Sequence, residues 1–272
     1  RIGLPFGTGE PHPANGKLHF TFWNDNGYDF ANHRTVKHRI VTVDPTDRDE
    51  PTVSDPINTP GRLLAVRGNT LYCLEAVYGR NNTFKRLLNT ANLTGTTATL
   101  LDSIEVPDTL WSLTVGSQGD LVAGVERSEY YYYDVYYTEN FPGGGANGGG
   151  EVAIGLPDAQ PAEPGNGAVG SPEENWRTGS KLWYYDTSDP SNIALLGNLD
   201  LASHWAEINS IHEPNIFVTT DWQIIAALEL TGSTLELVDY GMCGWFSDKM
   251  RVSDTQALLP AGMFGILYLD LD

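Results

Sequence analysis

A short strand-like phrase recurs along the chain and constrains its fold more than any other feature. The copies are RIVTVDPTD at 39–47, LLNTANLTG at 87–95, KLWYYDTSD at 181–189, IIAALELTG at 224–232 and ILYLDLD at 266–272. Each copy is an apolar or aromatic run that ends in a polar residue, and most continue into a turn. Recurrence of this kind predicts one sheet unit that is used several times.

The polar residue that closes each copy gives the period of the repeat. These residues are Asp44, Asn92, Asp186, Glu229 and Asp270, with separations of 48, 94, 43 and 41 residues. The long interval contains 130–179, and without those 50 residues it falls to 44. A four-stranded propeller blade is about 40 to 50 residues long. The sequence therefore predicts an all-β propeller with an insertion at 130–179.

Turn residues divide each unit into four expected strands. In the second unit these are 62–67, 70–77, 84–93 and 98–106, and later units repeat the order. A small sheet with two apolar faces is stable only when it is stacked on neighbours, which a ring of blades achieves. We expect one domain over 1–272 with about five blades, the last of which ends at its third strand.

Two ways of closing the ring remain open from the sequence. In the first, residues 2–6 add the missing outer strand of the last blade and complete a five-bladed ring, which would cover an open sheet edge. In the second, the chain belongs to a larger propeller that further blades or a partner subunit complete. We favour the first.

Two phrases carry a family resemblance. KLWYYDTSDPSNIALLGNLDL at 181–201 and RIVTVDPTDRDEPTVSDPI at 39–57 resemble the blades of secreted bacterial and archaeal β-propeller repeat proteins, which read LxVVDVSDPSNPxxLG. The Asp-Pro of that signature is missing after Asn92, Glu229 and Asp270. The resemblance implies propeller blades and an extracytoplasmic location. Asp-Thr-Ser-Asp-Pro also has a structural explanation, a tight turn in which side-chain oxygens bond the backbone.

Charge and cysteine content exclude several classes of protein. The net charge of −19 opposes binding to a phosphate backbone, so nucleic acid is not an expected partner. No apolar run approaches the roughly 20 residues of a membrane-spanning helix.

The chain begins with Arg1 rather than Met, which we interpret as a processed or trimmed start. Cys73 and Cys243 fall two units apart, so we expect buried free thiols rather than a disulfide.

The insertion is the expected contact surface, because repeat proteins often place long excursions on the face that binds. Its first part, EYYYYDVYY, contains six tyrosines: Tyr130, Tyr131, Tyr132, Tyr133, Tyr136 and Tyr137. Tyrosine offers a flat apolar body with a hydroxyl tip, which suits contacts with another protein or a glycan. The alternative is a long inner strand whose rings pack between blades. The following FPGGGANGGG lacks the Lys of a phosphate loop and is interpreted as a linker.

Carboxylates provide an alternative function. A glycoside hydrolase or lyase would need two acids that face each other across blades at the channel mouth. The candidates, in or near expected inner strands, are Glu75, Glu126, Glu207, Asp221 and Asp248. The alternative is that they are turn-forming or solvated acids. No GxSxG motif of a serine hydrolase is present.

Metal ligands form no known pattern. NDNGYD at 24–29 has a faint likeness to a calcium loop and makes Asp25 and Asp29 candidates, although an Asn-Gly hairpin turn explains it as well. His33 and His38 flank the entry to a strand and are the other metal candidates. No organic cofactor is predicted.

These observations favour an extracytoplasmic β-propeller that acts as a binding or scaffold module rather than as an enzyme. Its partner would be another protein or a glycan, and 130–179 would be its main contact surface. The alternatives are the propeller enzyme described above and a subunit of a larger cell-surface or electron-transfer assembly.

Overall fold

The structure, a computed structural model, describes residues 4, 8–23, 38–78, 84–126, 179–201, 203, 205–220, 224–242, 251–253, 255–260 and 265–271. All secondary-structure elements within these ranges are β-strands, and they form five antiparallel sheets. Each sheet is built from residues that are consecutive in the described sequence. Residues 130–178 of the insertion, which include its six tyrosines, residues 24–37 and Cys243 lie outside the described residues.

The first two sheets contain residues 12–106. Sheet 1 has the order β1 (His12–Ala14), β2 (Lys17–Trp23), β3 (His38–Asp44) and β4 (Thr52–Val53), and β5 (Ile57–Thr59) also pairs with β3. Sheet 2 has the order β6 (Arg62–Arg67), β7 (Thr70–Tyr78), β8 (Phe84–Thr94) and β9 (Thr97–Val106).

The other three sheets follow the same plan. Sheet 3 has the order β10 (Leu110–Val115), β11 (Leu121–Glu126), β12 (Lys181–Asp186) and β13 (Ala194–Asp200). Sheet 4 has the order β14 (Ala206–His212), β15 (Asn215–Thr220), β16 (Ile224–Thr231) and β17 (Thr234–Met242). Sheet 5 has three described strands, β18 (Arg251–Val252), β19 (Gln256–Pro260) and β20 (Ile266–Asp270).

The repeat predicted from the sequence is confirmed at the level of sheets. The polar residue that closes each phrase lies at or near the end of the third strand of its sheet, as Asp44 does in β3 and Asp186 in β12. The chain is therefore an all-β protein with repeated four-stranded antiparallel sheets, and its arrangement is propeller-like. The last sheet stops at its third strand among the described residues, as expected.

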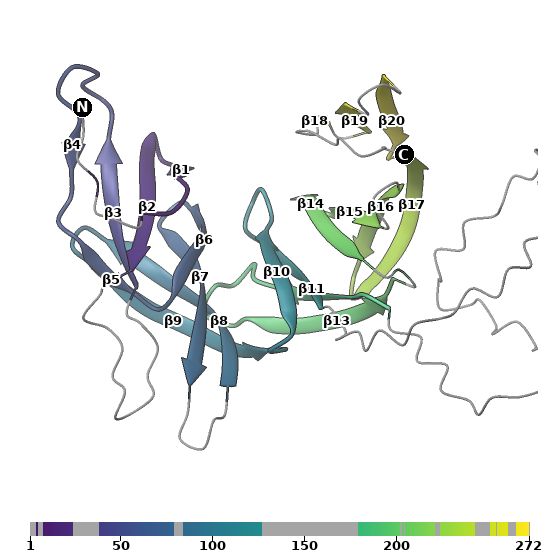
Figure 1. The fold of residues 1–272 in the computed structure, drawn as a ribbon, viewed down its shortest axis with the longest axis horizontal. Coiled ribbons are helices and arrows are strands. Elements are labelled where there is room, and N and C mark those ends of the chain that lie inside the picture. Colours follow the sequence, from purple (N-terminus) through teal and green to yellow (C-terminus); the bar gives the residue numbers. More distant parts are fainter. Residues whose placement is uncertain are drawn as a thin grey trace, which may run out of the picture.

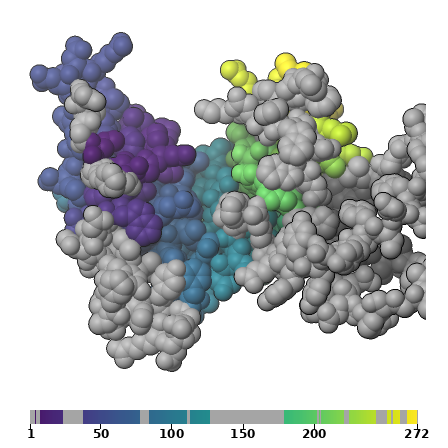
Figure 2. Space-filling view, viewed as in Figure 1, coloured from purple at the N-terminus to yellow at the C-terminus, as the bar shows by residue number. Residues whose placement is uncertain are grey.

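The sheets follow one another along an open arc, with sheet 1 at one end and sheet 5 at the other (Figure 1). The space-filling view shows a hollow between the purple and blue end and the green and yellow end (Figure 2). Within the described strands β20 pairs only with β19. Apart from Leu4, residues 2–6 lie outside the described part, so their pairing with the last sheet stays a prediction.

Hydrophobic cores lie between successive sheets. They contain Ile40 with Leu71 between sheets 1 and 2, Leu88 with Tyr185 between sheets 2 and 3, Leu182 with Ile216 between sheets 3 and 4, and Phe217 with Leu259 between sheets 4 and 5. Strand β15 is buried along its whole length because its alternate side chains face opposite neighbours. Ile216 and Val218 pack in the core toward sheet 3, and Phe217 packs toward sheet 5. Burial of apolar side chains on both faces is what holds such small sheets together.

The antiparallel order gives the arc two different edges. Connections from first to second and from third to fourth strands emerge at one edge, which we call the turn edge; examples are residues 15–16, 68–69, 213–214 and 232–233. Connections from second to third strands, and those to the next sheet, emerge at the opposite edge, which we call the loop edge. The long connections 24–37 and 127–180 belong to the loop edge.

The Asp-Thr-Ser-Asp-Pro phrase forms the turn between β12 and β13. Asp186 Oδ1 accepts hydrogen bonds from the backbone N–H and the hydroxyl of Ser188, at 2.9 and 2.7 Å. Asp44 Oδ1 accepts the same pair of bonds from Thr46. In sheet 3 the turn also contacts sheet 2, where Asp102 Oδ2 accepts from the Ile193 N–H at 2.6 Å. The structural explanation of this phrase is confirmed, and the turn links neighbouring sheets.

Candidate functional site

The base of the insertion lies at the loop edge of sheet 3. Glu126 ends β11, Lys181 begins β12, and the two residues are direct partners in the ladder. The connection between them therefore leaves and re-enters the sheet at neighbouring positions. The six tyrosines proposed for binding lie within this connection and outside the described residues, so their role stays a prediction.

Glu126 holds a tryptophan at the base of the insertion. Its Oε2 accepts a hydrogen bond from the Trp183 Nε1–H at 2.6 Å, and its Oε1 accepts one from the Thr109 hydroxyl at 2.6 Å. Trp183 lies on β12, and Thr109 belongs to the connection that enters sheet 3. The Lys181 ammonium group lies 5.9 Å from the centre of the Trp183 ring, and it also pairs with Asp200 at 3.5 Å. The hydrogen bond from Nε1 to Glu126 thus fixes the orientation of the Trp183 indole.

A groove of about 470 Å³ lies beside Trp183, between sheets 2 and 3. We call it the Trp183 groove; it is lined by Phe84, Lys85, Glu105, Val106, Pro107, Asp108, Trp183, Tyr185 and Leu195. Most of the lining from sheet 2 belongs to the loop-edge ends of β8 and β9. The Lys85 Nζ and Glu105 Oε2 atoms form an exposed ion pair at 2.5 Å. The groove therefore combines aromatic surface with a charged wall.

The structure places three of the five acids proposed for catalysis. Glu75 on β7 accepts a hydrogen bond from Asn89 Nδ2 at 3.1 Å. Glu126 is engaged by Thr109 and Trp183, and Glu207 is exposed on β14. Asp221 and Asp248 lie outside the described residues. The bonds of Glu75 and Glu126 orient neighbouring side chains, and the acid-pair alternative stays a prediction.

Of the metal candidates, only His38 is described. It is 5% exposed, the centre of its ring lies 4.7 Å from that of Trp23, and neither of its nitrogens has a hydrogen-bond partner among the residues that the structure describes. Burial holds the pKa of His38 below its ordinary value, which favours the neutral ring. No group of three His, Cys, Asp or Glu residues that could hold an ion occurs in the described part of the chain. Asp25, Asp29 and His33 lie outside it, and calcium stays a prediction.

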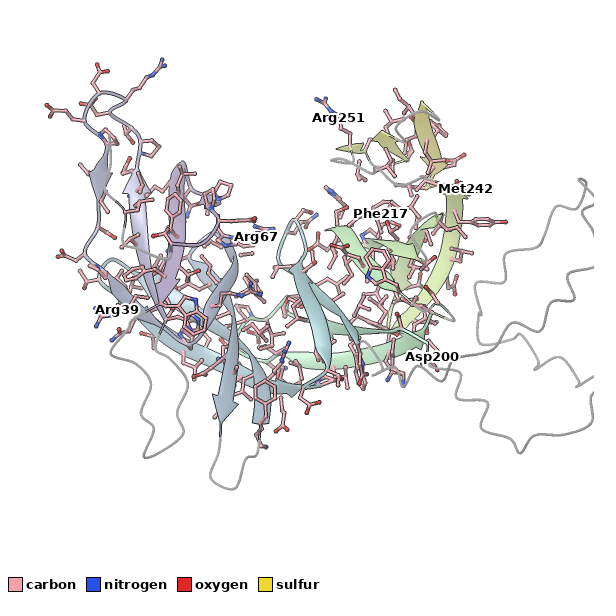
Figure 3. The ribbon with its side chains drawn as sticks, viewed as in Figure 1. Arg39, Arg67, Asp200, Phe217, Met242 and Arg251 are labelled. Carbon is pink, nitrogen blue, oxygen red and sulfur yellow. The ribbon has the colours of Figure 1, made fainter. Side chains whose placement is uncertain are left out.

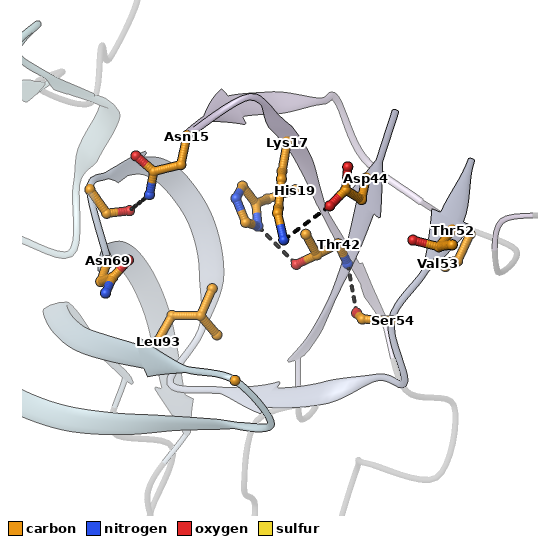
Figure 4. A pocket seen from close by; sticks show the side chains of 12 residues that line it. Asn15, Lys17, His19, Thr42, Asp44, Thr52, Val53, Ser54, Asn69 and Leu93 are labelled. Carbon is orange, nitrogen blue, oxygen red and sulfur yellow. Dashed lines mark hydrogen bonds and ion pairs between the residues drawn. The ribbon is translucent and has the colours of Figure 1, made fainter. Parts of the chain in front are cut away.

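A second, polar pocket of about 350 Å³ lies at the turn edge between sheets 1 and 2 (Figure 4). Lys17 Nζ lies 3.2 Å from Asp44 Oδ2, and His19 Nδ1 lies 3.0 Å from the Thr42 hydroxyl. Hydrogen bonds from Thr46, with the nearby Lys17, lower the pKa of Asp44 to about 2. Since these groups bind one another, the pocket is explained by the packing of the turns. Sequence reasoning missed it.

Cys73 is a free, buried thiol on β7, as expected, and burial raises its pKa. The described residues include no helix long and apolar enough to cross a membrane.

Comparison with known proteins assigns no family. No family model matches the sequence, and no curated protein matches it. Among solved structures, an acylaminoacyl peptidase in complex with Z-Gly-Gly-Phe-chloromethyl ketone aligns with a TM-score of 0.47 at 10% identity, over 93% of this chain and 35% of that one. Acylaminoacyl peptidase from Pyrococcus horikoshii gives 0.46 at 11% identity over the same shares of the two chains.

A putative 6-phosphogluconolactonase from Bacteroides uniformis aligns with a TM-score of 0.41 at 9% identity, over 96% of this chain and 82% of that one. The chain thus spans about a third of the peptidases it matches and most of the lactonase. At these identities and scores the likenesses assign neither an activity nor a site.

Proposed function

We propose that this chain is a β-propeller module that binds another protein or a glycan through its loop edge, with residues 130–179 as the main contact surface. One observation carries the proposal. The chain's longest connection emerges at the loop edge, directly beside a groove lined by Trp183 and Tyr185. Long connections on one edge of a rigid scaffold are where repeat proteins usually bind.

The scaffold and the contact surface are separable in this arrangement. Because Glu126 and Lys181 are ladder partners, deletion of 130–179 leaves residues 127–129 and 180 as a short hairpin connection between β11 and β12. The described residues that fill the cores between the sheets come from the strands and their short connections. A binding role therefore predicts that the deleted protein folds and fails to bind.

The test compares partners captured by the full chain and by the 130–179 deletion from the extracellular fraction of the source cells. We expect the deletion to keep its β-sheet circular dichroism and thermal midpoint while the captured partners disappear. Replacing the six tyrosines by Ser should have the same effect. The matched control replaces two exposed tyrosines elsewhere, Tyr240 and Tyr268, and should capture normally. An unchanged set of partners for the deletion would refute the proposal.

The location outside the cytoplasm and the closure of the ring belong to the same proposal. The first is supported by the resemblance of 181–201 to blades of secreted repeat proteins. The second is supported by the stacking of sheets 1 to 5 along an arc. Either residues 2–6 or a partner subunit would complete the ring, and the molar mass in solution separates a monomer from an assembly.

A further inference from the structure

The Trp183 groove offers an aromatic surface whose polar atom is already engaged. The indole N–H of Trp183 donates to Glu126, so the part of the ring that lines the groove can contribute stacking but no further hydrogen bond. Tyr185 and Val106 in the same lining are almost fully buried, while Leu195 is 48% exposed. Leu195 therefore adds an exposed apolar side chain to the lining beside Trp183.

The opposite wall of the groove is polar and carries charges of both signs. Lys85 donates to Glu105, and Asp108 adds a second carboxylate to the lining. Both side chains of the ion pair are more than half exposed to solvent. A ligand can therefore replace the water around them. A ligand hydroxyl both donates and accepts, and neighbouring hydroxyls can therefore bind the ammonium group and the carboxylate together.

The charge of the whole protein restricts the ligand further. A net charge of −19 repels phosphates, sulfates and acidic peptides from most of the surface. This charge disfavours anions but not cations. Among uncharged ligands, one with an apolar face that stacks on an aromatic ring and a row of hydroxyls fits the groove. A pyranose ring combines these properties.

We propose that the Trp183 groove binds a neutral pyranose unit of a glycan, which stacks on Trp183 and places its hydroxyls against Lys85, Glu105 and Asp108. This inference rests on the proposed binding function and names a ligand class for the groove next to the insertion. Glu126 acts as a positioning residue, because it fixes the indole and is also the last paired residue of β11 before the insertion.

The experiment screens the full chain against an array of neutral oligosaccharides and then titrates the best ligand by calorimetry. Trp183→Phe keeps a ring but loses the larger stacking surface and the bond to Glu126, and we expect binding about three- to tenfold weaker. Lys85→Met with Glu105→Gln changes only exposed atoms of the other wall and should also weaken binding. The matched control is Trp23→Phe, because Trp23 is 51% exposed on sheet 1 and does not line the groove. It should bind as the unchanged chain does.

Three results would overturn the assignment of a sugar: no neutral glycan bound by the full chain, glycan binding that the groove variants leave unchanged, or binding of a proline-rich peptide that Trp183→Phe abolishes. The capture experiment with the 130–179 deletion distinguishes the two proposals. If the array is negative and the deletion still loses its partners, only the sugar proposal fails. If glycan binding depends on Trp183 while the deletion keeps every partner, only the insertion's role fails.

Discussion

The turn edge and the loop edge of the arc are built from the same strands but differ in how neighbouring sheets are joined. At the turn edge, short connections are bonded from one sheet to the next by side chains that reach backbone atoms. At the loop edge, Arg86 of sheet 2 also donates to the Leu110 carbonyl of sheet 3, but long connections emerge there beside a groove. Under the proposed function, the turn edge would supply stability and the loop edge would supply contact, so that the loop edge could vary without loss of the scaffold.

The turn between β10 and β11, residues 116–120, shows how the turn edge joins neighbouring sheets. From sheet 2, Arg67, which is labelled in Figure 3, donates through Nε to the Gly116 carbonyl at 2.8 Å. The Tyr72 hydroxyl of the same sheet donates to the Gly119 carbonyl at 2.8 Å. From sheet 4, the Glu213 carboxylate accepts from the Ser117 hydroxyl at 2.8 Å and from the Gly119 N–H at 3.2 Å. One turn is therefore bonded to both neighbouring sheets.

The largest effect should come from Gly119→Ala. Gly119 has φ of 93°, and a Cβ there would lie 2.7 Å from the Tyr72 hydroxyl and 2.9 Å from Arg67 Cγ. The backbone strain and the displaced neighbours together should lower the free energy of unfolding by about 2–4 kcal/mol, as measured by urea denaturation.

The matched control for that substitution is Gly232→Ala in the turn between β16 and β17. Gly232 also has a positive φ, 65°, but a Cβ there would meet no atom within 4 Å. Gly232→Ala should lower the free energy of unfolding by about 1 kcal/mol, because only the backbone conformation is strained. If Gly119→Ala costs no more than Gly232→Ala, the turn edge does not hold the sheets together as described.

Sequence reasoning reached the features that lie within one repeat unit. The strand at 62–67 was predicted to the residue, and those at 70–77, 84–93 and 98–106 to within one residue, because apolar runs and turn residues are local signals. The Asp186 turn was predicted for the same reason. The bond between Glu126 and Trp183 and the engagement of Glu213 by the turn at 116–119 were not predicted. Glu126 and Trp183 lie on adjacent strands of one sheet that the insertion separates in the sequence. Glu213 and the turn belong to neighbouring sheets, which only stacking brings together.

A smaller effect is expected for Glu213→Gln. Burial alone would raise the pKa of Glu213, but hydrogen bonds from backbone groups and from Ser117 outweigh it, and the pKa lies below its ordinary value. The substitution should lower the free energy of unfolding by about 1–2 kcal/mol at pH 7, near the low end for bonds to a charged group because Glu213 is partly exposed.

The pH dependence tests the same carboxylate. A pKa lowered on folding contributes stability above the unfolded-state pKa and loses it as the pH falls through the folded-state value. The difference in free energy of unfolding between wild type and Glu213→Gln should therefore shrink as the pH falls below the ordinary carboxyl pKa of 4.5, as urea denaturation at several pH values would show.

A methyl at Gly116 would overlap the Glu213 carboxylate, so the stability losses of Gly116→Ala and Glu213→Gln should be less than additive. Full additivity would contradict the contact.

The smallest effect should come from Tyr72→Phe, since the Gly119 carbonyl has a second donor. The hydroxyl of Thr187, in the Asp-Thr-Ser-Asp turn of sheet 3, donates to the same oxygen at 2.7 Å. Loss of one donor should cost about 0.5–1 kcal/mol, and Thr187→Val alone should cost a similar amount. The double variant removes both hydroxyl donors from this oxygen and should cost more than the sum, as urea denaturation would show. Such coupling would mean that the bond from Thr187 within sheet 3 and the bond from Tyr72 of sheet 2 depend on each other at the Gly119 carbonyl. Strict additivity would mean that the two bonds act separately.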